Sequence, residues 1–230
     1  MSKKPPLGEF ISEFLGSMFL VMVSVSSMIM FTMVFEASKG IAVFANAIAV
    51  AFVLCALVEM FGPISGAHFN PVVTMVMLFE KKISAIRAVL FMLFQFIGGT
   101  VGIVFSHLMF FDYIGILLSV SNNVRDEYIF FGEIFGTFIL VFAILLLVKI
   151  GSNKISIVVG FLVGGQIMST SSTMFANPQV TVARMFTNTV SGIRPVDGLI
   201  FIAMQIIGAL MAYAVYKLMF ANKIYRTEEE

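Results

Sequence analysis

The sequence Asn-Pro-Val-Val-Thr at residues 70–74 has a counterpart, Asn-Pro-Gln-Val-Thr, at residues 177–181. An Asn-Pro pair is a typical start of a helix, because the asparagine side chain caps free backbone N–H groups and proline fits the first turn. Both pairs lie in strongly apolar surroundings. We therefore predict two helices that begin in the middle of a membrane, an arrangement typical of a pore.

The composition predicts an integral membrane protein. Of the 230 residues, 60% are hydrophobic and only 12% are charged, and the mean hydropathy is +1.03. A soluble protein of this length would not need so much apolar surface. The net charge of +1 gives no indication of a nucleic-acid partner. The single cysteine, Cys55, lies in an apolar run, where we expect a buried and inert thiol.

Six stretches are long enough to cross a bilayer, which takes roughly 20 helical residues. We interpret them as helices rather than β-strands, and we place them near residues 8–34, 41–62, 84–110, 128–149, 155–173 and 196–220. Two shorter segments, about 70–80 and 177–187, follow the Asn-Pro pairs, and each is long enough for about half a membrane. Two half-helices that meet end to end would make one extra span.

The distribution of lysine and arginine predicts the orientation. Ten of them fall on the side shared by both termini, and four fall on the other side. Because positive charges concentrate in cytoplasmic segments, we expect both termini in the cytoplasm. The short loops suggest a bacterial inner membrane.

The two halves of the chain resemble each other. Residues 13–21 of the first span match residues 133–141 of the fourth, and Gln-Phe-Ile-Gly-Gly at 95–99 matches Gln-Ile-Ile-Gly-Ala at 205–209. Each half holds three spans and one half-helix. Since three is odd, the second half must be inverted relative to the first. We predict one all-α membrane channel domain over residues 1–230, with inverted halves at about 8–115 and 127–221.

The junction of the two half-helices has a chemistry of its own. Each helix directs a positive dipole end at the centre of the pore, which raises an electrostatic barrier against cations and protons. Asn70 and Asn177 would cap through their carbonyl oxygens, leaving each amide NH₂ to donate to a passing oxygen. This arrangement favours neutral solutes that carry oxygen. The alternative is that each Asn-Pro pair begins an ordinary surface loop, which two equivalent copies make less favourable.

At residues 65–74, the sequence Ser-Gly-Ala-His-Phe-Asn-Pro-Val-Val-Thr resembles the first signature of the aquaporin, or major intrinsic protein, family. The second Asn-Pro pair, the glutamates of the first and fourth spans and the Gln-x-x-Gly-Gly element are also similar to that family, over about residues 8–220. The resemblance implies a homotetramer in which each protomer has its own pore. It also implies a pore-lining signature made of Asn70, Pro71, Val72, Asn177, Pro178 and Gln179.

The same resemblance suggests roles for two glutamates and a histidine. A charge inside an apolar helix costs at least about 2.5 kcal/mol unless it has a partner. In the family, the glutamates that match Glu13 and Glu133 accept hydrogen bonds from the re-entrant loops. The alternative for each is a charge that reaches the membrane interface. His68 would lie at the cytoplasmic mouth, either lining the pore or serving as an ordinary loop histidine.

The chain departs from the family in both signatures. Most members have Asn-Pro-Ala, whereas here Val72 and Gln179 stand in the third position. Gln179 would either line the pore or brace the opposite loop. Members selective for water or glycerol usually carry a filter arginine three residues after the second asparagine, where this chain has Val180. Counting from the motifs without gaps places the other filter positions at Val50, Gly165 and Met174. Such a filter should be wider and less selective for water.

Arg184 offers a replacement for the missing arginine. It lies four residues beyond Val180, on the same face of the expected half-helix and one turn farther outward. Helical side chains lean toward the N-terminus, so its guanidinium would reach back over the filter. The alternative is an arginine at the mouth that pairs with solvent or with a loop acid.

The motif Asn-Pro-x-Val-Thr in both halves, with Ala-Arg after the second, resembles a bacterial subgroup linked to arsenite and other uncharged metalloid hydroxides. We predict a passive channel for small neutral solutes, namely glycerol-like polyols, metalloid hydroxides, urea-like molecules and water. The alternatives are a water-selective channel, a scaffold with a closed pore, and a secondary transporter. The transporter is disfavoured because we find no paired ionisable residues to bind a driving ion. The sequence shows no metal, nucleotide or catalytic motif, so we expect neither enzyme activity nor a cofactor.

Overall fold

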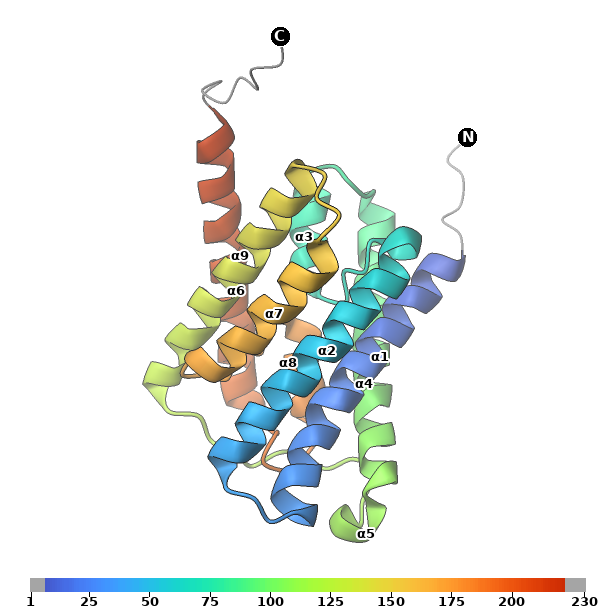
Figure 1. Ribbon diagram of the computed structural model, residues 1–230, viewed down its shortest axis with the longest axis vertical. Helices are drawn as coiled ribbons and strands as arrows, with labels where there is room; N and C mark the ends of the chain where they lie inside the picture. The colour runs from blue at the N-terminus through green and yellow to red at the C-terminus, as the bar shows by residue number, and fades with distance from the viewer. Residues whose placement is uncertain (1–6, 222–230) are drawn as a thin grey trace.

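The computed structural model describes residues 7–221, and the regular elements within this range are all helical (Figure 1). The long helices are α1 (Leu7–Ile29), α2 (Lys39–Ser65), α4 (Ala85–Met109), α6 (Phe130–Lys149), α7 (Ile155–Ser169) and α9 (Pro195–Ala221). The short helices are α3 (Pro71–Phe79), α5 (Phe111–Ile114) and α8 (Pro178–Arg184). A π-helical turn (Met30–Val34) extends α1, and a 3₁₀ turn (Glu127–Ile129) precedes α6. The all-helical membrane fold predicted from the sequence is confirmed.

Five of these helical segments are long and apolar enough to cross a membrane, and α7 is a shorter apolar helix of 15 residues. The sequence predicted this span, the fifth along the chain, over 155–173, but its helix ends at Ser169. Thr170 is extended, and Thr173 and Met174 have positive φ angles. The run of serines and threonines at 169–173 explains the early end, because their hydroxyls bond to nearby backbone and compete with the helix.

The two half-helices begin as the Asn-Pro pairs predict. Proline occupies the first turn of α3 and of α8, and an asparagine caps each helix. The side-chain oxygen of Asn70 accepts a hydrogen bond from the backbone N–H of Val72 at 3.1 Å, and that of Asn177 accepts one from Gln179, also at 3.1 Å. In Figure 1, α3 lies toward the end of the molecule where α1 starts and α9 finishes, and α8 lies toward the other end. The half-helices therefore enter from opposite sides.

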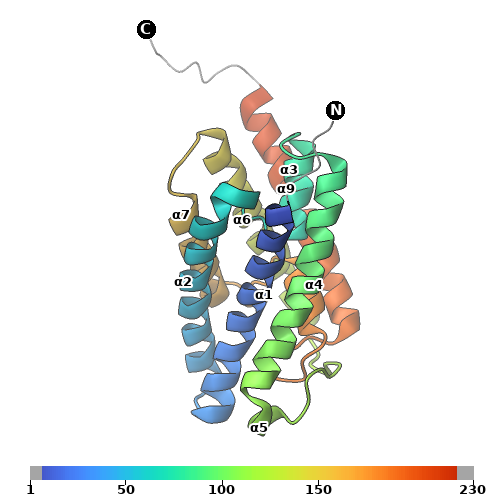
Figure 2. The same cartoon turned by 90° about the vertical axis from the view of Figure 1, so that its right-hand side faces the viewer.

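The inverted repeat is visible in the packing. Helix α1 packs along α4, as Figure 2 shows, and α6 packs along α9 in the same way. A Cβ atom at Gly98 would collide with the carbonyl oxygen of Phe14, and one at Gly208 would collide with that of Ile134. These glycines stand at matching places in the two halves, so each lets its helix pair approach closely. A third helix pair, α2 and α7, packs together and joins the two halves.

Candidate pore

A cavity of about 410 Å³ lies between the two halves of the chain. Its wall takes side chains from α1, α2, α4, α6 and α7 and from both half-helices with the loops before them. We call the end lined by His68, Lys82 and Arg87 the inner mouth, and the end lined by Phe175 and Arg184 the outer mouth. The cavity thus reaches from the residues of the inner mouth to those of the outer mouth, and we call its length between them the path.

The two cap asparagines line the cavity where the loops of the two half-helices meet. The side-chain amide of Asn70 donates to the carbonyl oxygen of Ala176 at 2.8 Å, and that of Asn177 donates to the carbonyl oxygen of Phe69 at 2.8 Å. Each NH₂ group therefore uses one N–H on the opposite loop, and its second N–H has no partner among the described residues. The junction provides two hydrogen-bond donors on the cavity wall.

Glu13 anchors the loop before α3. Its Oε1 accepts from the hydroxyl of Ser65 at 2.6 Å and from the backbone N–H of His68 at 3.0 Å. Its Oε2 accepts from the backbone N–H of Phe69 at 2.8 Å and from the amide of Gln95 at 2.7 Å. The side chain is fully buried, so these four donors replace the water that an exposed carboxylate would bind.

Glu133 anchors the loop before α8 in the same manner. Its two oxygens accept from the backbone N–H groups of Phe175 at 2.9 Å and Ala176 at 2.8 Å. The amide of Gln205 donates to it at 2.6 Å and to the hydroxyl of Thr181 at 2.9 Å. Glu133 is also fully buried. The role suggested by the resemblance therefore has matching hydrogen bonds in both halves.

Gln179 does not line the cavity. It is fully buried, and its amide donates to the carbonyl oxygen of Phe69 at 3.2 Å. Its Oε1 lies so close to Gly99 that a Cβ atom there would collide with it. Of the two roles considered from the sequence, the geometry corresponds to a brace for the opposite loop.

The other signature residues also lie behind the pore surface. Val72 packs in an apolar cluster with Val141 and Ala209 and is 2% exposed. Pro71 and Pro178 form the first turns of their helices and do not line the cavity. Within the signature, only the two asparagines face the cavity; the other four residues shape the loops that present them.

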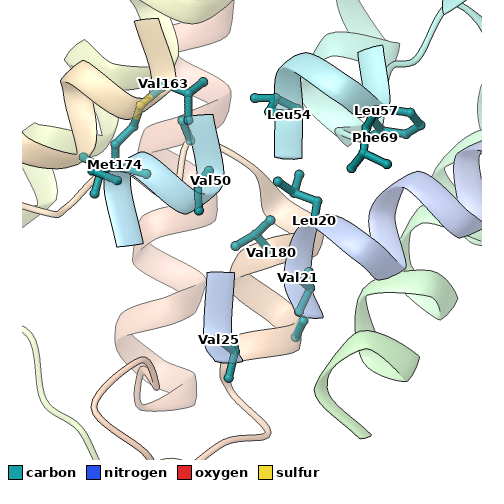
Figure 3. Close-up of a cluster of buried hydrophobic side chains, with 14 of the residues drawn as sticks. Leu20, Val21, Val25, Val50, Leu54, Leu57, Phe69, Val163, Met174 and Val180 are labelled. Atoms are coloured by element: carbon teal, nitrogen blue, oxygen red, sulfur yellow. The ribbon is translucent and has the colours of Figure 1, made fainter. Parts of the chain in front are cut away.

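Four of the five residues assigned to the filter line the cavity near the outer mouth, namely Val50, Met174, Val180 and Arg184. Figure 3 shows Val50, Met174 and Val180 among the apolar side chains between the helices. Val50, Met174 and Val180 are apolar and buried.

Gly165 is placed wrongly by the sequence count. It lies on the exposed face of α7, where a Cβ atom would meet nothing within 4 Å, and it does not line the cavity. Ile167 of the same helix lines the cavity instead. The count assumed no gaps across the irregular segment after Ser169, and a shift of two helical positions turns a side chain to the opposite face. We call the four apolar cavity-lining residues Val50, Ile167, Met174 and Val180 the apolar ring.

Arg184 is 7% exposed and lines the cavity. Its Cζ lies 4.3 Å from the centroid of the Phe175 ring, a geometry that favours cation–π attraction. Its Nε is buried without a hydrogen-bond partner, and within residues 7–221 its guanidinium forms no ion pair. The aromatic ring, rather than a loop acid, therefore holds this cation.

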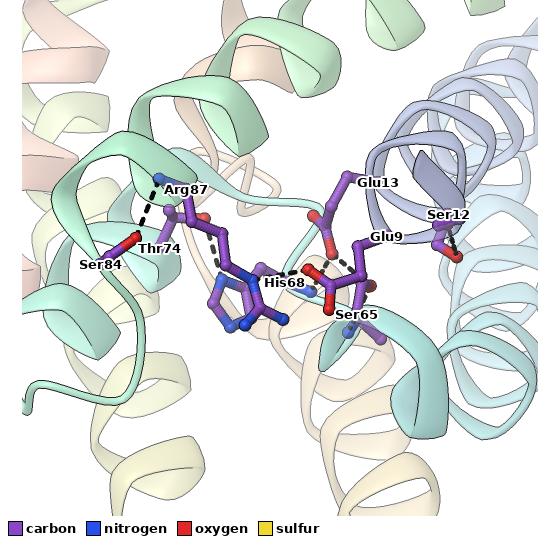
Figure 4. Close-up of polar contacts among 10 residues, drawn as sticks. Glu9, Ser12, Glu13, Ser65, His68, Thr74, Ser84 and Arg87 are labelled. Carbon is purple, nitrogen blue, oxygen red and sulfur yellow. Dashed lines mark hydrogen bonds and ion pairs between the residues drawn. The ribbon is translucent and has the colours of Figure 1, made fainter. Parts of the chain in front are cut away.

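The inner mouth contains residues that the motifs single out and others that they do not. His68 lines it, and its Nδ1 lies 3.1 Å from the hydroxyl of Thr74. Arg87 also lines it, and its Nε lies 2.7 Å from Oε2 of Glu9 (Figure 4). No local motif marks Arg87. The available signal is an acid and a base in the first turns of two spans that begin on the same side.

Comparison with known families agrees with this architecture. Residues 1–175 match the model of the family described as major intrinsic protein. The chain belongs to this family. Major intrinsic proteins are channels and not enzymes.

Individual relatives extend the comparison over nearly the whole chain. Aquaglyceroporin AqpS of Rhizobium meliloti is 34% identical over 207 residues, which cover 90% of this chain and 88% of that protein. Glycerol uptake facilitator protein-like 6 of Lactiplantibacillus plantarum is 36% identical over 40% of this chain and 39% of its own length. The X-ray structure of the aquaglyceroporin from Plasmodium falciparum superposes with a TM-score of 0.71 at 18% identity, covering 95% of this chain and 97% of that one. This last likeness concerns the fold of the major intrinsic proteins.

Proposed function

We propose that this channel passes small neutral solutes: glycerol-like polyols, urea, uncharged metalloid hydroxides such as arsenous acid, and water. The observation that carries the proposal is the apolar ring near the outer mouth. Val180 stands in this ring where most relatives selective for water or glycerol carry arginine, and Val50, Ile167 and Met174 complete it. The free-energy cost of entering the ring is lower for a carbon-bearing solute when the ring has no charge, because no guanidinium in it must be desolvated or displaced.

The pore centre supplies the polar half of the interaction. The free N–H of Asn70 or Asn177 donates a hydrogen bond to a hydroxyl oxygen of the solute. The carbon side of the solute lies against apolar wall residues. The positive ends of the half-helices face this point and disfavour cations. A neutral molecule with several oxygens fits both conditions.

Metalloid hydroxides meet the same requirements. Arsenous acid is uncharged at pH 7, carries several hydroxyls and is similar in size to glycerol. The similarity to a rhizobial aquaglyceroporin supports the polyol part of the proposal. The metalloid part rests on this chemical likeness and on the Asn-Pro-x-Val-Thr motif in both halves.

We also propose that the chain forms a homotetramer in the lipid bilayer, with one pore in each protomer and no nucleic-acid partner. Exposed apolar side chains along α2, such as Phe44, Ile48 and Phe52, support this, because they suit contact with a neighbour or with lipid. The start of α1 and the end of α9 lie at one end of the bundle (Figure 1), and the excess of positive charge there suggests the cytoplasmic side of a bacterial inner membrane.

A water-selective channel is the second candidate, because one observation favours it. Arg184 lines the outer mouth, where its guanidinium would narrow the path beside Met174. If both side chains extend into the path, water would pass and glycerol would be excluded.

Stopped-flow light scattering on proteoliposomes separates the candidates. Vesicles are shrunk with an impermeant osmolyte to measure water flux, and a glycerol gradient then measures reswelling. Glycerol reswelling faster than in empty vesicles supports the proposal, and uptake of arsenous acid is the next test. Rapid water flux with glycerol excluded favours the water-selective channel, whereas absence of both fluxes indicates a closed pore.

A further inference from the structure

The charged side chains around the cavity are all of one sign. Lys82, Arg87 and Arg184 line it, and within residues 7–221 no aspartate or glutamate does. The two arginines lie at opposite mouths, and Lys82 is an exposed residue at the inner rim. A solute that crosses the cavity must therefore pass two guanidinium groups.

Arg87 is held in place at the inner mouth by two contacts. Its Nε lies 2.7 Å from Oε2 of Glu9, and its Cζ lies 5.3 Å from the centroid of the Phe91 ring (Figure 4). The Glu9 side chain is 10% exposed and does not line the cavity, whereas the Arg87 side chain is 29% exposed and does. The pair is neutral overall, but its positive member faces the path.

His68 completes this rim. Its ring packs edge-on against the same Phe91, with centroids 5.4 Å apart, and it lines the cavity beside Arg87. Its Nδ1 is engaged by the hydroxyl of Thr74. The inner mouth thus presents a guanidinium and an imidazole on one fully buried aromatic ring.

The outer mouth has a similar construction from unrelated residues. Arg184 lies over Phe175, which also lines the cavity. Glu133 holds the loop of Phe175 through backbone N–H groups and does not line the cavity. At each mouth, therefore, a phenylalanine ring lies against an arginine. The glutamate that supports the site, Glu9 at the inner mouth and Glu133 at the outer mouth, does not line the cavity. A cation–π contact positions a guanidinium without cancelling its charge.

We propose that Arg87 is a specificity-determining residue: it forms, at the inner mouth, a further barrier against cations in series with Arg184 and with the half-helix junction, and Glu9 and Phe91 position it. Its N–H groups also donate hydrogen bonds to the oxygens of neutral solutes, so the barrier acts on charge and not on size. The inference rests on the proposed function in one respect, because it takes the cavity as the conducting path.

Two barriers in series have a recognisable signature. Flux is limited by the higher barrier, so removing one arginine leaves the other to exclude cations. Removing both leaves only the half-helix junction as a barrier, so we expect the cation flux to rise by more than the sum of the single effects. A residue that is only structural would not show this synergy.

The test uses urea and guanidinium, two planar molecules of nearly equal size that differ in charge. Uptake of each is measured in proteoliposomes for the wild type, Arg87→Met, Arg184→Met and the double variant. Arg194→Met is the matched control, since Arg194 pairs with Asp197 at 2.8 Å and does not line the cavity. We expect guanidinium uptake to rise at least about tenfold in the double variant over either single variant. Urea uptake should equal the wild-type value in the Arg194→Met control, and for each cavity-lining arginine the readout is the ratio of guanidinium uptake to urea uptake.

A proton-leak assay with a pH dye inside the vesicles gives a second readout that does not depend on urea. Arg87→Lys keeps the positive charge. The double variant Arg87→Lys/Arg184→Met should therefore exclude guanidinium and protons better than Arg87→Met/Arg184→Met does. This rescue separates a charge effect from misfolding. The inference is overturned if the double variant passes no more guanidinium and no more protons than Arg184→Met alone. The wild-type urea and glycerol fluxes report separately on the proposed function.

Discussion

Asn70 and Asn177 each donate a hydrogen bond to the loop that precedes the other, to the carbonyl oxygens of Ala176 and Phe69, both at 2.8 Å. The two half-helices are therefore joined across the middle of the fold by a pair of reciprocal contacts. Each contact depends on a loop whose own shape is fixed by a buried glutamate. The predictions below test how these supports and the surrounding cavity determine stability and flux.

Replacing Glu133 with glutamine should destabilise the protein by about 2 kcal/mol or more, because an amide NH₂ would face backbone N–H donors that now bind a carboxylate. The hydrogen bonds from Phe175 and Ala176 would both be weakened. We expect a lower thermal unfolding midpoint in detergent and reduced water flux. Glu59→Gln is the matched control, since Glu59 is exposed and accepts only from Ser156 in the described chain. Equal midpoints for the two variants would contradict the anchoring role.

The brace formed by Gln179 can be tested through its neighbour Gly99. A Gly99→Ala substitution places a methyl group against Oε1 of Gln179 and should cost about 1–3 kcal/mol through overpacking. The double variant Gly99→Ala/Gln179→Ala should recover part of this loss, because the clash disappears while Asn177 still donates to Phe69. The measurement is the unfolding midpoint of both variants and of Gln179→Ala. A Gly99→Ala variant as stable as the wild type would show that the brace is not tightly packed.

Val180→Arg should convert the apolar ring into a narrow charged one. We expect glycerol flux to fall by at least about tenfold, since a guanidinium in the ring takes up space and must keep its hydration. Water flux should be much less affected. The ratio of the two fluxes in stopped-flow scattering checks this, with Val180→Leu as an uncharged control of larger volume. Undiminished glycerol flux in Val180→Arg would place the selective ring elsewhere.

The assignment of Ile167 to the wall in place of Gly165 leads to opposite expectations for two neighbours on α7. Ile167→Phe adds bulk to the cavity and should lower glycerol flux. Gly165→Ala should leave it unchanged, because a methyl group there meets nothing within 4 Å. A loss of flux in Gly165→Ala with none in Ile167→Phe would restore the original count.

Local signals predicted the fold well, and the reason is visible at the half-helices. An asparagine cap followed by proline acts within its own turn, so α3 and α8 start where the sequence indicates. The hydrophobic spans are also local, and their prediction needs only length and composition. The predicted end of α7 was less accurate, because serine and threonine side chains compete with the helix for backbone hydrogen bonds there.

The candidate site was harder to predict where it depends on contacts between distant segments. The role of Gln179 was undecided from the sequence, because its neighbours Phe69 and Gly99 belong to the other half of the chain. Arg87 was not singled out, since its pairing with Glu9 arises only when α1 and α4 pack side by side. Gly165 was misplaced by a count across an irregular loop.

The reciprocal asparagine contacts have a consequence for biogenesis. The carbonyl of Phe69 receives its donors from Asn177 and Gln179, about a hundred residues later in the chain. During synthesis, the first loop enters the membrane before these donors exist. The two half-helices can therefore be joined only after the second half has been inserted, and a chain released after its fourth span would expose unpaired polar groups to lipid.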